Sequence, residues 1–444
     1  MPPHARADGP ALGPARVITL SRPGHLAALP PLSLYVHLPW CLQKCPYCDF
    51  NSHELAPKTP SASAPQGGAS GLGRPGAGPF ALLTHAASTL PESRYLDALI
   101  ADLESSLPLI WGRRVHTIFI GGGTPSLFSP ASIDRLLADI RARLPLEAGC
   151  EITLEANPGT FEKDRFKGFR EAGVNRLSIG VQSFDDAKLK ALGRVHNSDQ
   201  ARAAIDEARS AFETFNIDLM YALPGQNLAG LQSDVQQALA FEPPHLSLYH
   251  LTLEPNTRFA TQPPRDLPDD DTAFDMLDHL IEATEAAGLR RYEVSAFARP
   301  SHQCQHNLNY WQFGDYLGIG AGAHGKLSFP ERIVRQVRWR EPATYMDKAL
   351  QGQALSNEHD IPLDARPFEF MLNGLRLKAG FELARFAERT GLTTAAIQRP
   401  LAEAEAKGLI ARDLQRVWPT ARGLDFLSDL QAMFLPANSA TKAS

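Results

Sequence analysis

Several features that define whole classes of protein are missing from this sequence. No apolar run reaches the ~18 residues that a membrane-spanning helix needs, and no secretory signal is recognised among the first thirty residues. The 444 residues include only five cysteines, an odd number, and three of these are crowded into one short segment. A disulfide framework is therefore disfavoured, and a metal or cluster site in a reducing compartment is favoured. We predict a cytoplasmic protein without a transmembrane segment.

An excess of positive charge is also missing. The 44 Lys and Arg residues stand against 49 Asp and Glu residues, which gives a net charge of −5. Binding to nucleic acid requires a basic face, so nucleic acid is not predicted as a partner. The length is sufficient for one large domain and a smaller one.

The composition changes along the chain and predicts five segments. A proline-rich, disordered lead-in is followed by the main domain, a connecting segment that carries a histidine motif, a C-terminal domain and a disordered tail. These segments are residues 1–31, 32–300, 301–359, 360–436 and 437–444. Within the main domain, residues 56–91 are rich in Ala, Pro, Gly and Ser and are expected to form a disordered insertion.

The main domain alternates between strand and helix patterns. Apolar and polar residues alternate strictly over Leu32–Leu38, which is typical of a strand. Further strands are predicted at Val115–Ile120, Glu151–Glu155, Arg176–Val181, Phe215–Tyr221, His245–Leu251 and Arg291–Ala296, with helical patterns between them. Repeated βα units imply a parallel sheet, flat or closed into a barrel. In such α/β folds the functional residues follow the carboxyl ends of the strands.

The last segment has a different pattern. Short amphipathic helices are predicted at Phe368–Leu377, Leu383–Thr390, Ala395–Lys407 and Gly423–Phe434, with a small hairpin near Trp418. Helices combined with a hairpin indicate a winged-helix-like domain, which is not basic enough to suggest DNA binding.

The three crowded cysteines follow the first strand with the spacing Cys41-x-x-x-Cys45-x-x-Cys48. Three thiolates can bind three irons of a cubane and leave the fourth iron open. A structural zinc site is the alternative, but it needs four ligands, and Cys150 and Cys304 lie far away in the sequence. A redox-active Cys45–Cys48 pair is a further alternative that gives Cys41 no role.

Residues 35–50, YVHLPWCLQKCPYCDF, resemble the signature of radical S-adenosylmethionine (SAM) proteins. Within this family, the segment resembles most closely the branch that contains the oxygen-independent coproporphyrinogen III oxidases and the HemW-type haem chaperones. The resemblance extends over about residues 33–435. It implies a partial (β/α)6-type barrel in which Cys41, Cys45 and Cys48 hold a [4Fe–4S] cluster and SAM binds the open iron. An electron from the cluster can then cleave SAM to a 5′-deoxyadenosyl radical.

The resemblance also implies which residues bind SAM. They are Tyr35, Tyr47, Gly122, Gly123, Thr124, Glu155, Gln182, Arg194 and Asp218. Glycine lets a backbone approach a ligand closely, and a carboxylate can accept hydrogen bonds from ribose hydroxyls or an ammonium group. The alternatives remain open: Glu155, Gln182 and Asp218 as structural polar groups inside the barrel, and Arg194 as a solvated helix charge.

Two features distinguish the oxidases from the chaperones. Phe50 stands where the oxidases usually carry a fourth cysteine, and His306-Asn-Leu-Asn-Tyr-Trp311 resembles the haem-linked motif of the chaperones. Imidazole binds haem iron and aromatic rings pack on the macrocycle, so His306 is the first candidate axial ligand and His324 the second. Alternatively, His306 and Trp311 form a structural corner between the two domains, and Cys304 is either near a haem link or simply a buried residue.

The favoured function is a chaperone that binds haem, a [4Fe–4S] cluster and SAM and delivers haem to an acceptor haemoprotein. A radical SAM porphyrinogen oxidase is the alternative, and a structural zinc protein ranks last. No catalytic residue is predicted and enzymatic activity is left open. A homodimer and peripheral association with a membrane are both compatible with this hypothesis.

Overall fold

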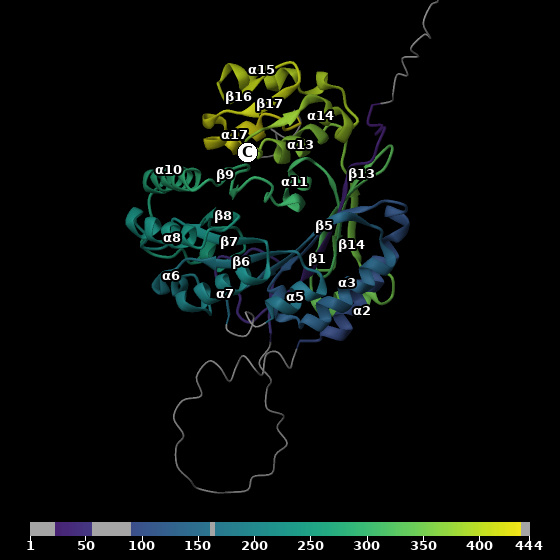
Figure 1. The fold of residues 1–444 in the computed structure, drawn as a ribbon. Helices are drawn as coiled ribbons and strands as arrows, with labels where there is room; N and C mark the ends of the chain where they lie inside the picture. Colours follow the sequence, from purple (N-terminus) through teal and green to yellow (C-terminus); the bar gives the residue numbers. More distant parts are fainter. Residues whose placement is uncertain (1–22, 56–89, 160–164, 437–444) are drawn as a thin grey trace, which may run out of the picture.

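The computed structural model describes residues 23–55, 90–159 and 165–436 (Figure 1). Most of the predicted lead-in, residues 56–89 of the predicted insertion and the predicted tail lie outside these ranges.

A twelve-stranded sheet forms the main domain, with the strand order β14-β13-β12-β11-β1-β4-β5-β6-β7-β8-β10-β9. Its strands are β1 (Leu32–Leu38), β4 (Val115–Gly122), β5 (Leu146–Ala156), β6 (Arg176–Gln182), β7 (Thr214–Tyr221), β8 (His245–His250), β9 (Arg290–Arg291), β10 (Ala296–Ala298), β11 (Asp315–Ile319), β12 (His324–Ser328), β13 (Ile333–Arg338) and β14 (Leu355–Asp360). Strands β1 and β4 to β8 are parallel and follow chain order, and β11 adds a seventh parallel strand beside β1. The predicted α/β class and partial barrel are confirmed.

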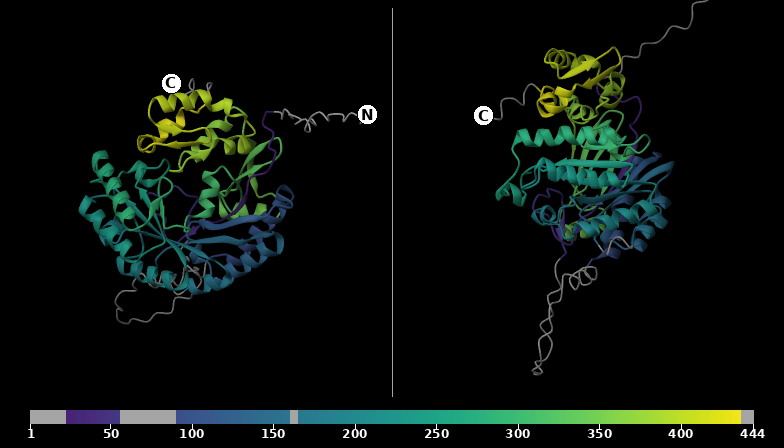
Figure 2. Two further views of the ribbon diagram at one scale, coloured as in Figure 1. Left: turned by 45° about the horizontal axis from the view of Figure 1, so that its top comes forward. Right: turned by 60° about the vertical axis from the view of Figure 1, so that its left-hand side comes forward.

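Helices connect the parallel strands and cover the outer, convex side of the curved sheet (Figure 2). The helical elements of the main domain are α2 (Glu92–Ser106), η1 (Leu107–Ile110), η2 (Pro125–Leu127), α3 (Pro130–Arg143), α5 (Phe166–Ala172), α6 (Asp186–Ala191), α7 (Ser198–Ala211), α8 (Leu228–Ala240), α9 (Arg258–Thr261), α10 (Asp270–Ala286), α11 (Gln305–Trp311) and α12 (Pro342–Ala349). The apolar residues of β1, such as Leu34 and Val36, pack into the core beneath these helices. The polar residues of β1 therefore face the barrel interior.

Two parts of the main domain differ from the sequence expectation. The predicted strand Arg291–Ala296 is a hairpin, in which β9 pairs with β10 and β10 returns antiparallel to β8. The segment predicted to be a connection, residues 301–359, contributes helix α11 and four strands to the sheet, and β12, β13 and β14 are antiparallel.

The C-terminal domain packs beside α11 and the β9–β10 hairpin (Figure 1). Its elements are α13 (Arg366–Gly374), β15 (Phe381–Glu382), α14 (Leu383–Thr390), η3 (Thr394–Ile397), α15 (Gln398–Ala406), β16 (Ile410–Arg412), β17 (Arg416–Pro419), α16 (Ala421–Asp425) and α17 (Leu427–Ala432). The three strands form a separate antiparallel sheet, and the helices enclose a core built around Phe370 and Phe386. This arrangement of short helices and a small sheet agrees with the winged-helix-like expectation.

Candidate functional site

The three crowded cysteines lie in a loop at the carboxyl end of β1. The loop begins with β2 (Trp40–Cys41), which pairs with β3 (His53–Glu54). Two backbone hydrogen bonds tie the loop to the end of β4: Gly123 N–H donates to Leu38 O and Thr124 N–H donates to Trp40 O, both at 2.8 Å. Hydrogen bonds to β4 thus fix the position of Cys41 at the mouth of the barrel.

Each of the three thiols has a different polar neighbour. The Thr124 hydroxyl donates to Cys41 Sγ at 3.5 Å, Arg194 Nη1 donates to Cys45 Sγ at 3.6 Å, and Cys48 Sγ lies 3.6 Å from a serine hydroxyl. Burial, with a smaller contribution from the charges of Cys48 and Cys45, raises the pKa of Cys41 to about 11. The three sulfurs are therefore close enough to interact electrostatically.

The donor set suits a cluster better than a single metal ion. Among the residues that the structure describes, no group of three or more His, Cys, Asp or Glu side chains could hold one metal ion. Thiolates that bind three different irons of a cubane need not converge on one point, whereas the four ligands of a structural zinc must. The placement of the three thiols is compatible with a cubane, which takes one thiolate per iron.

The glycines after β4 serve close packing between two chain segments. A Cβ atom on Gly123 would lie 2.6 Å from the Trp40 carbonyl oxygen, and Gly122 has a φ of +121° and lies against the His37 ring. Side chains at these positions would push the cysteine loop away from β4. The structure thus gives these glycines a role in placing the loop, in addition to the ligand contact that the resemblance implies.

The carboxyl groups of Glu155 and Asp218 lie close enough inside the barrel for the charge of Asp218 to affect Glu155. Gly122 N–H donates to Glu155 Oε2 at 3.0 Å. Burial, followed by the charge of Asp218, raises the pKa of Glu155 to about 8, and burial raises the pKa of Asp218 to about 6. Two carboxyl groups that resist ionisation are well suited to a cationic ligand, which would favour their charged forms.

Tyr35 and His37 lie on the same interior face of β1. The Tyr35 hydroxyl is 2.9 Å from His37 Nδ1, and His37 Nε2 is 2.9 Å from the carbonyl oxygen of Asn51. Burial lowers the pKa of His37 to about 4, so the imidazole is neutral. Both nitrogens of His37 are therefore engaged, and both residues line one cavity of the barrel.

A residue absent from the sequence prediction connects several of the predicted ones. Asn157 Nδ2 donates to Thr124 Oγ1 at 2.9 Å, and Arg194 Nη2 donates to Asn157 Oδ1 at 2.5 Å. Tyr47 and Cys45 raise the pKa of Arg194 in spite of its burial. The position of Asn157, two residues after Glu155 and just beyond the end of the same strand, was the signal that could have identified Asn157.

Gln182, another residue of the predicted SAM site, lies at the end of β6 and has a φ of +71°.

A second missed feature is a chain of buried hydrogen bonds that leads away from Asp218. Asn216 Nδ2 donates to Asp218 Oδ1 at 2.7 Å, and Asn216 Oδ1 lies 2.7 Å from His245 Nδ1. His245 Nε2 lies 2.9 Å from the Tyr292 hydroxyl, which accepts the backbone N–H of Cys304 at 3.2 Å. These bonds join the interior carboxyl to the residues that precede α11.

Helix α11 closes the amino-terminal end of the barrel, opposite the cysteine loop. His306 Nδ1 lies 2.8 Å from Thr117 Oγ1, and Asn309 Nδ2 donates to Ser33 Oγ at 2.8 Å. The His306 side chain is buried, its pKa is lowered by burial to about 3, and its Nε2 has no partner among the described residues. In this structure the motif packs at the corner between the barrel and the C-terminal domain, and its role in haem binding stays a prediction.

The other residues near the motif support this interpretation. Arg376 stacks over Trp311 at 4.3 Å from the ring centroid and so links α11 to the C-terminal domain. Cys304 is 3% exposed, and burial raises its pKa to about 12. A buried protonated thiol is inert.

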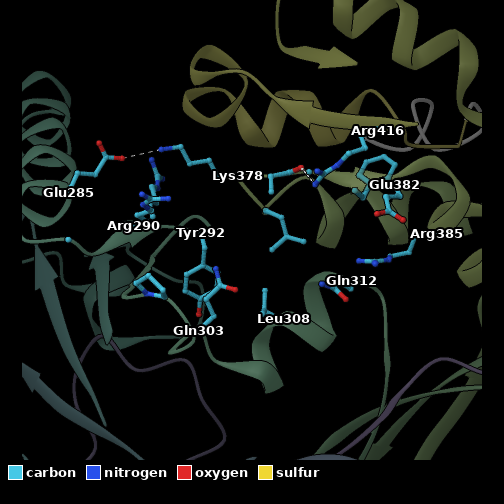
Figure 3. Close-up of a pocket in the computed structure, with 17 residues that line it drawn as sticks. Glu285, Arg290, Tyr292, Gln303, Leu308, Gln312, Lys378, Glu382, Arg385 and Arg416 are labelled. Carbon is cyan, nitrogen blue, oxygen red and sulfur yellow. Dashed lines mark hydrogen bonds and ion pairs between the residues drawn. The ribbon is translucent and has the colours of Figure 1, made fainter. Parts of the chain in front are cut away.

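Residues of α11 line two cavities: Tyr310 lines one and Leu308 lines the other. The first, which we call the inner pocket, has a volume of about 410 Å³ and is lined by Tyr35, Phe50, Tyr310, Tyr316, His324 and Arg340, among others. The second, which we call the basic cleft, has a volume of about 900 Å³ and lies between the barrel and the C-terminal domain (Figure 3). Its walls carry Arg290, Lys378, Arg385 and Arg416, with Leu308 of α11 between them.

Comparison with known families defines the class of protein. Residues 35–238 match the Radical SAM superfamily, and residues 361–426 match the HemN C-terminal domain. The coproporphyrinogen III oxidase HemN from Escherichia coli, described as a radical SAM enzyme, superposes with a TM-score of 0.72 at 24% identity and covers 92% of this chain and 91% of its own. The fold is that of a radical SAM barrel with a HemN-type C-terminal domain.

Curated relatives narrow the assignment. The heme chaperone HemW of Escherichia coli K12 is 45% identical over 92% of this chain and 100% of its own length. The heme chaperone HemW of Bacillus subtilis is 32% identical over 88% of this chain and 96% of its own. The chain belongs to the HemW heme chaperone family.

The family implies a [4Fe–4S] cluster and SAM, and the donor set at the mouth of the barrel suits both. Of the described helices, none is long and apolar enough to cross a membrane.

Proposed function

We propose that this protein is a haem chaperone: it binds haem at the barrel, with a [4Fe–4S] cluster on Cys41, Cys45 and Cys48 and SAM beside it, and passes haem to an acceptor haemoprotein. The observation that carries this proposal is the match to HemW chaperones along nearly the whole chain. The inner pocket supports it, because aromatic walls with a histidine and an arginine suit a macrocycle that carries iron and propionates.

The residues at the strand ends supply the proposed SAM site. Glu155 and Asp218 offer carboxyl oxygens to the ammonium and ribose hydroxyls of SAM, and Arg194 lies where it can pair with a carboxylate. When bound, the cluster supplies the electron for cleavage of SAM; the protein orients the nucleotide and excludes water. The predictions for Tyr47, Gln182 and the glycines remain part of this proposal.

The oxidase alternative is supported by the fold alone. Phe50 occupies the position of the fourth cysteine that oxidases usually carry, and its ring lines the inner pocket. We further propose that the chain works in the cytoplasm. A homodimer and peripheral association with a membrane are compatible with this function.

One sample can test the proposal. The chain is reconstituted anaerobically with iron and sulfide, titrated with haem, and then mixed with an apo-haemoprotein and, separately, with coproporphyrinogen III. We expect haem to bind at about one per chain and to pass to the apo-protein. Efficient decarboxylation of coproporphyrinogen III without haem transfer would establish the oxidase instead.

A further inference from the structure

The position of the haem iron can be inferred from which histidines are both accessible and unpartnered. The sequence places His306 first, but that side chain is only 1% exposed, and its ring is enclosed by Phe119 and Tyr310 at 5.0 Å. Entry of a macrocycle on that side would require α11 to leave the barrel, since its side chains bond to both β1 and β4.

The basic cleft offers space but no ligand for iron. Of the described residues that line it, none is His, Cys or Met. The hydroxyl of Tyr292, the one aromatic oxygen among them, is already bonded to His245 and to the backbone of Cys304. Haem iron in proteins takes its axial ligand from histidine, cysteine, methionine or tyrosine, so the cleft is a poor haem site despite its arginines.

Two histidines, His37 and His324, line the inner pocket. Of the two, His324 alone has ring nitrogens without a hydrogen-bond partner among the described residues. His37 uses both ring nitrogens. His324, the first residue of β12, is exposed to the pocket, and neither of its ring nitrogens has a hydrogen-bond partner among the described residues. Burial, together with the nearby charges of Arg335 and Arg340, lowers the pKa of His324, which keeps the imidazole neutral and able to bind a metal.

The other residues of the inner pocket suit haem, which is a flat macrocycle with two propionate groups. Tyr310 and Tyr316 lie 4.2 Å apart between ring centroids and form one aromatic wall. Phe50, 63% exposed, presents an uncovered ring from the cysteine loop. Arg340 is exposed and lines the pocket, and no ion pair joins its guanidinium to another described residue, so it is available to a propionate. Asp49 is the opposing charge among the lining residues.

We propose that haem binds in the inner pocket with His324 as the axial ligand of its iron, Arg340 paired with a propionate and Phe50 against the macrocycle. This inference rests on the proposed haem-chaperone function and specifies its binding site. The histidine motif on α11 then shapes the floor of the pocket through Tyr310, and His306 positions that helix through Thr117.

The test compares histidine variants of the full, cluster-reconstituted chain in anaerobic haem titrations. We expect His324→Ala to weaken haem binding by ~10–100-fold or more, the range seen when even a supporting residue of a metal site is lost. His324→Gly should regain binding when free imidazole is added, and His324→Cys should give the absorption and electron paramagnetic resonance signature of a thiolate-ligated ferric haem. His359→Ala, on the exposed strand β14, is the matched control.

His306→Gln keeps a hydrogen-bonding group for Thr117 and should leave the haem spectrum unchanged. Iron content and circular dichroism establish that each variant is folded and carries its cluster. A wild-type chain that binds no haem would refute the proposed function. If the wild type binds haem and His324→Ala retains its affinity and spectrum, the function stands and the assignment of His324 is wrong; loss of the spectrum in His306→Gln alone would identify His306 as the ligand.

Discussion

Replacing Glu155 by Gln tests the proposed SAM site through its dependence on pH. The pKa of Glu155 is raised to about 8 because the group is buried near Asp218. A cationic ligand favours the ionised carboxyl, so SAM binding should release a proton from this group. With a pKa of about 8, roughly 1% of the carboxyl is ionised at pH 6 and half at pH 8, so SAM affinity should rise roughly 50-fold over that range.

The variant should lose both the affinity and its rise with pH. A hydrogen bond to a charged group contributes ~1.5–3 kcal/mol, so Glu155→Gln should weaken SAM binding roughly 10- to 150-fold at pH 8. Anaerobic calorimetry of both chains between pH 6 and pH 9 measures this, and the variant corrects for titration of SAM itself. Equal pH dependence in the two chains would refute the reasoning.

The same pKa has a consequence for stability without SAM. The folded pKa of Glu155 lies above its ordinary value of 4.5, so folding favours the protonated form. The stability that this group contributes is complete below pH 4.5 and is lost as the pH rises to about 8. Glu155→Gln, which cannot ionise, should therefore be more stable than the wild type above pH 8 in urea titrations.

Three further changes test the cysteine loop and the core. Cys48→Ser should abolish the cluster, measured as iron and sulfide per chain, whereas Cys304→Ser should retain it; full iron content in Cys48→Ser would contradict the ligand assignment. Asp102→Ala leaves a fully buried arginine without its partner and should cost ~3–5 kcal/mol in urea unfolding; a loss below about 1 kcal/mol would contradict it. Gly123→Ala places a methyl group against Trp40 O and should cost ~1–3 kcal/mol and lower the iron content, whereas an unchanged melting temperature would show that the loop adapts.

The parallel half of the sheet could be predicted because its strands and helices bury apolar faces in regular periods. Helix α8 (Leu228–Ala240) and β1 (Leu32–Leu38) have the predicted bounds. Strands β12 and β13 were missed because they bury charge. Lys326 is paired with Asp315 inside the fold, and Arg338 is fully buried, so the hydropathy pattern of these strands is not that of a sheet.

The site was predictable only where a residue type is unusual for its position. The cysteine spacing indicated the loop after β1, and Glu155 and Asp218 lie on the interior face of their strands as expected. The roles of Asn157 and His245 depend on contacts between strands distant in the sequence, which spacing does not reveal. The enclosure of His306 has the same cause, since the helix that carries it closes an end of the barrel that is built from five other segments.

The central place of β1 in the sheet affects how the protein is made. β1 emerges early from the ribosome, but one of its neighbours, β11, comprises residues 315–319. Until residues 315–319 have been synthesised, one edge of the strand that leads to the cysteines has no partner, and an uncovered edge invites pairing with other chains. Loading of iron and sulfide should therefore be a late event that follows translation, and truncated chains that end before residue 315 should aggregate.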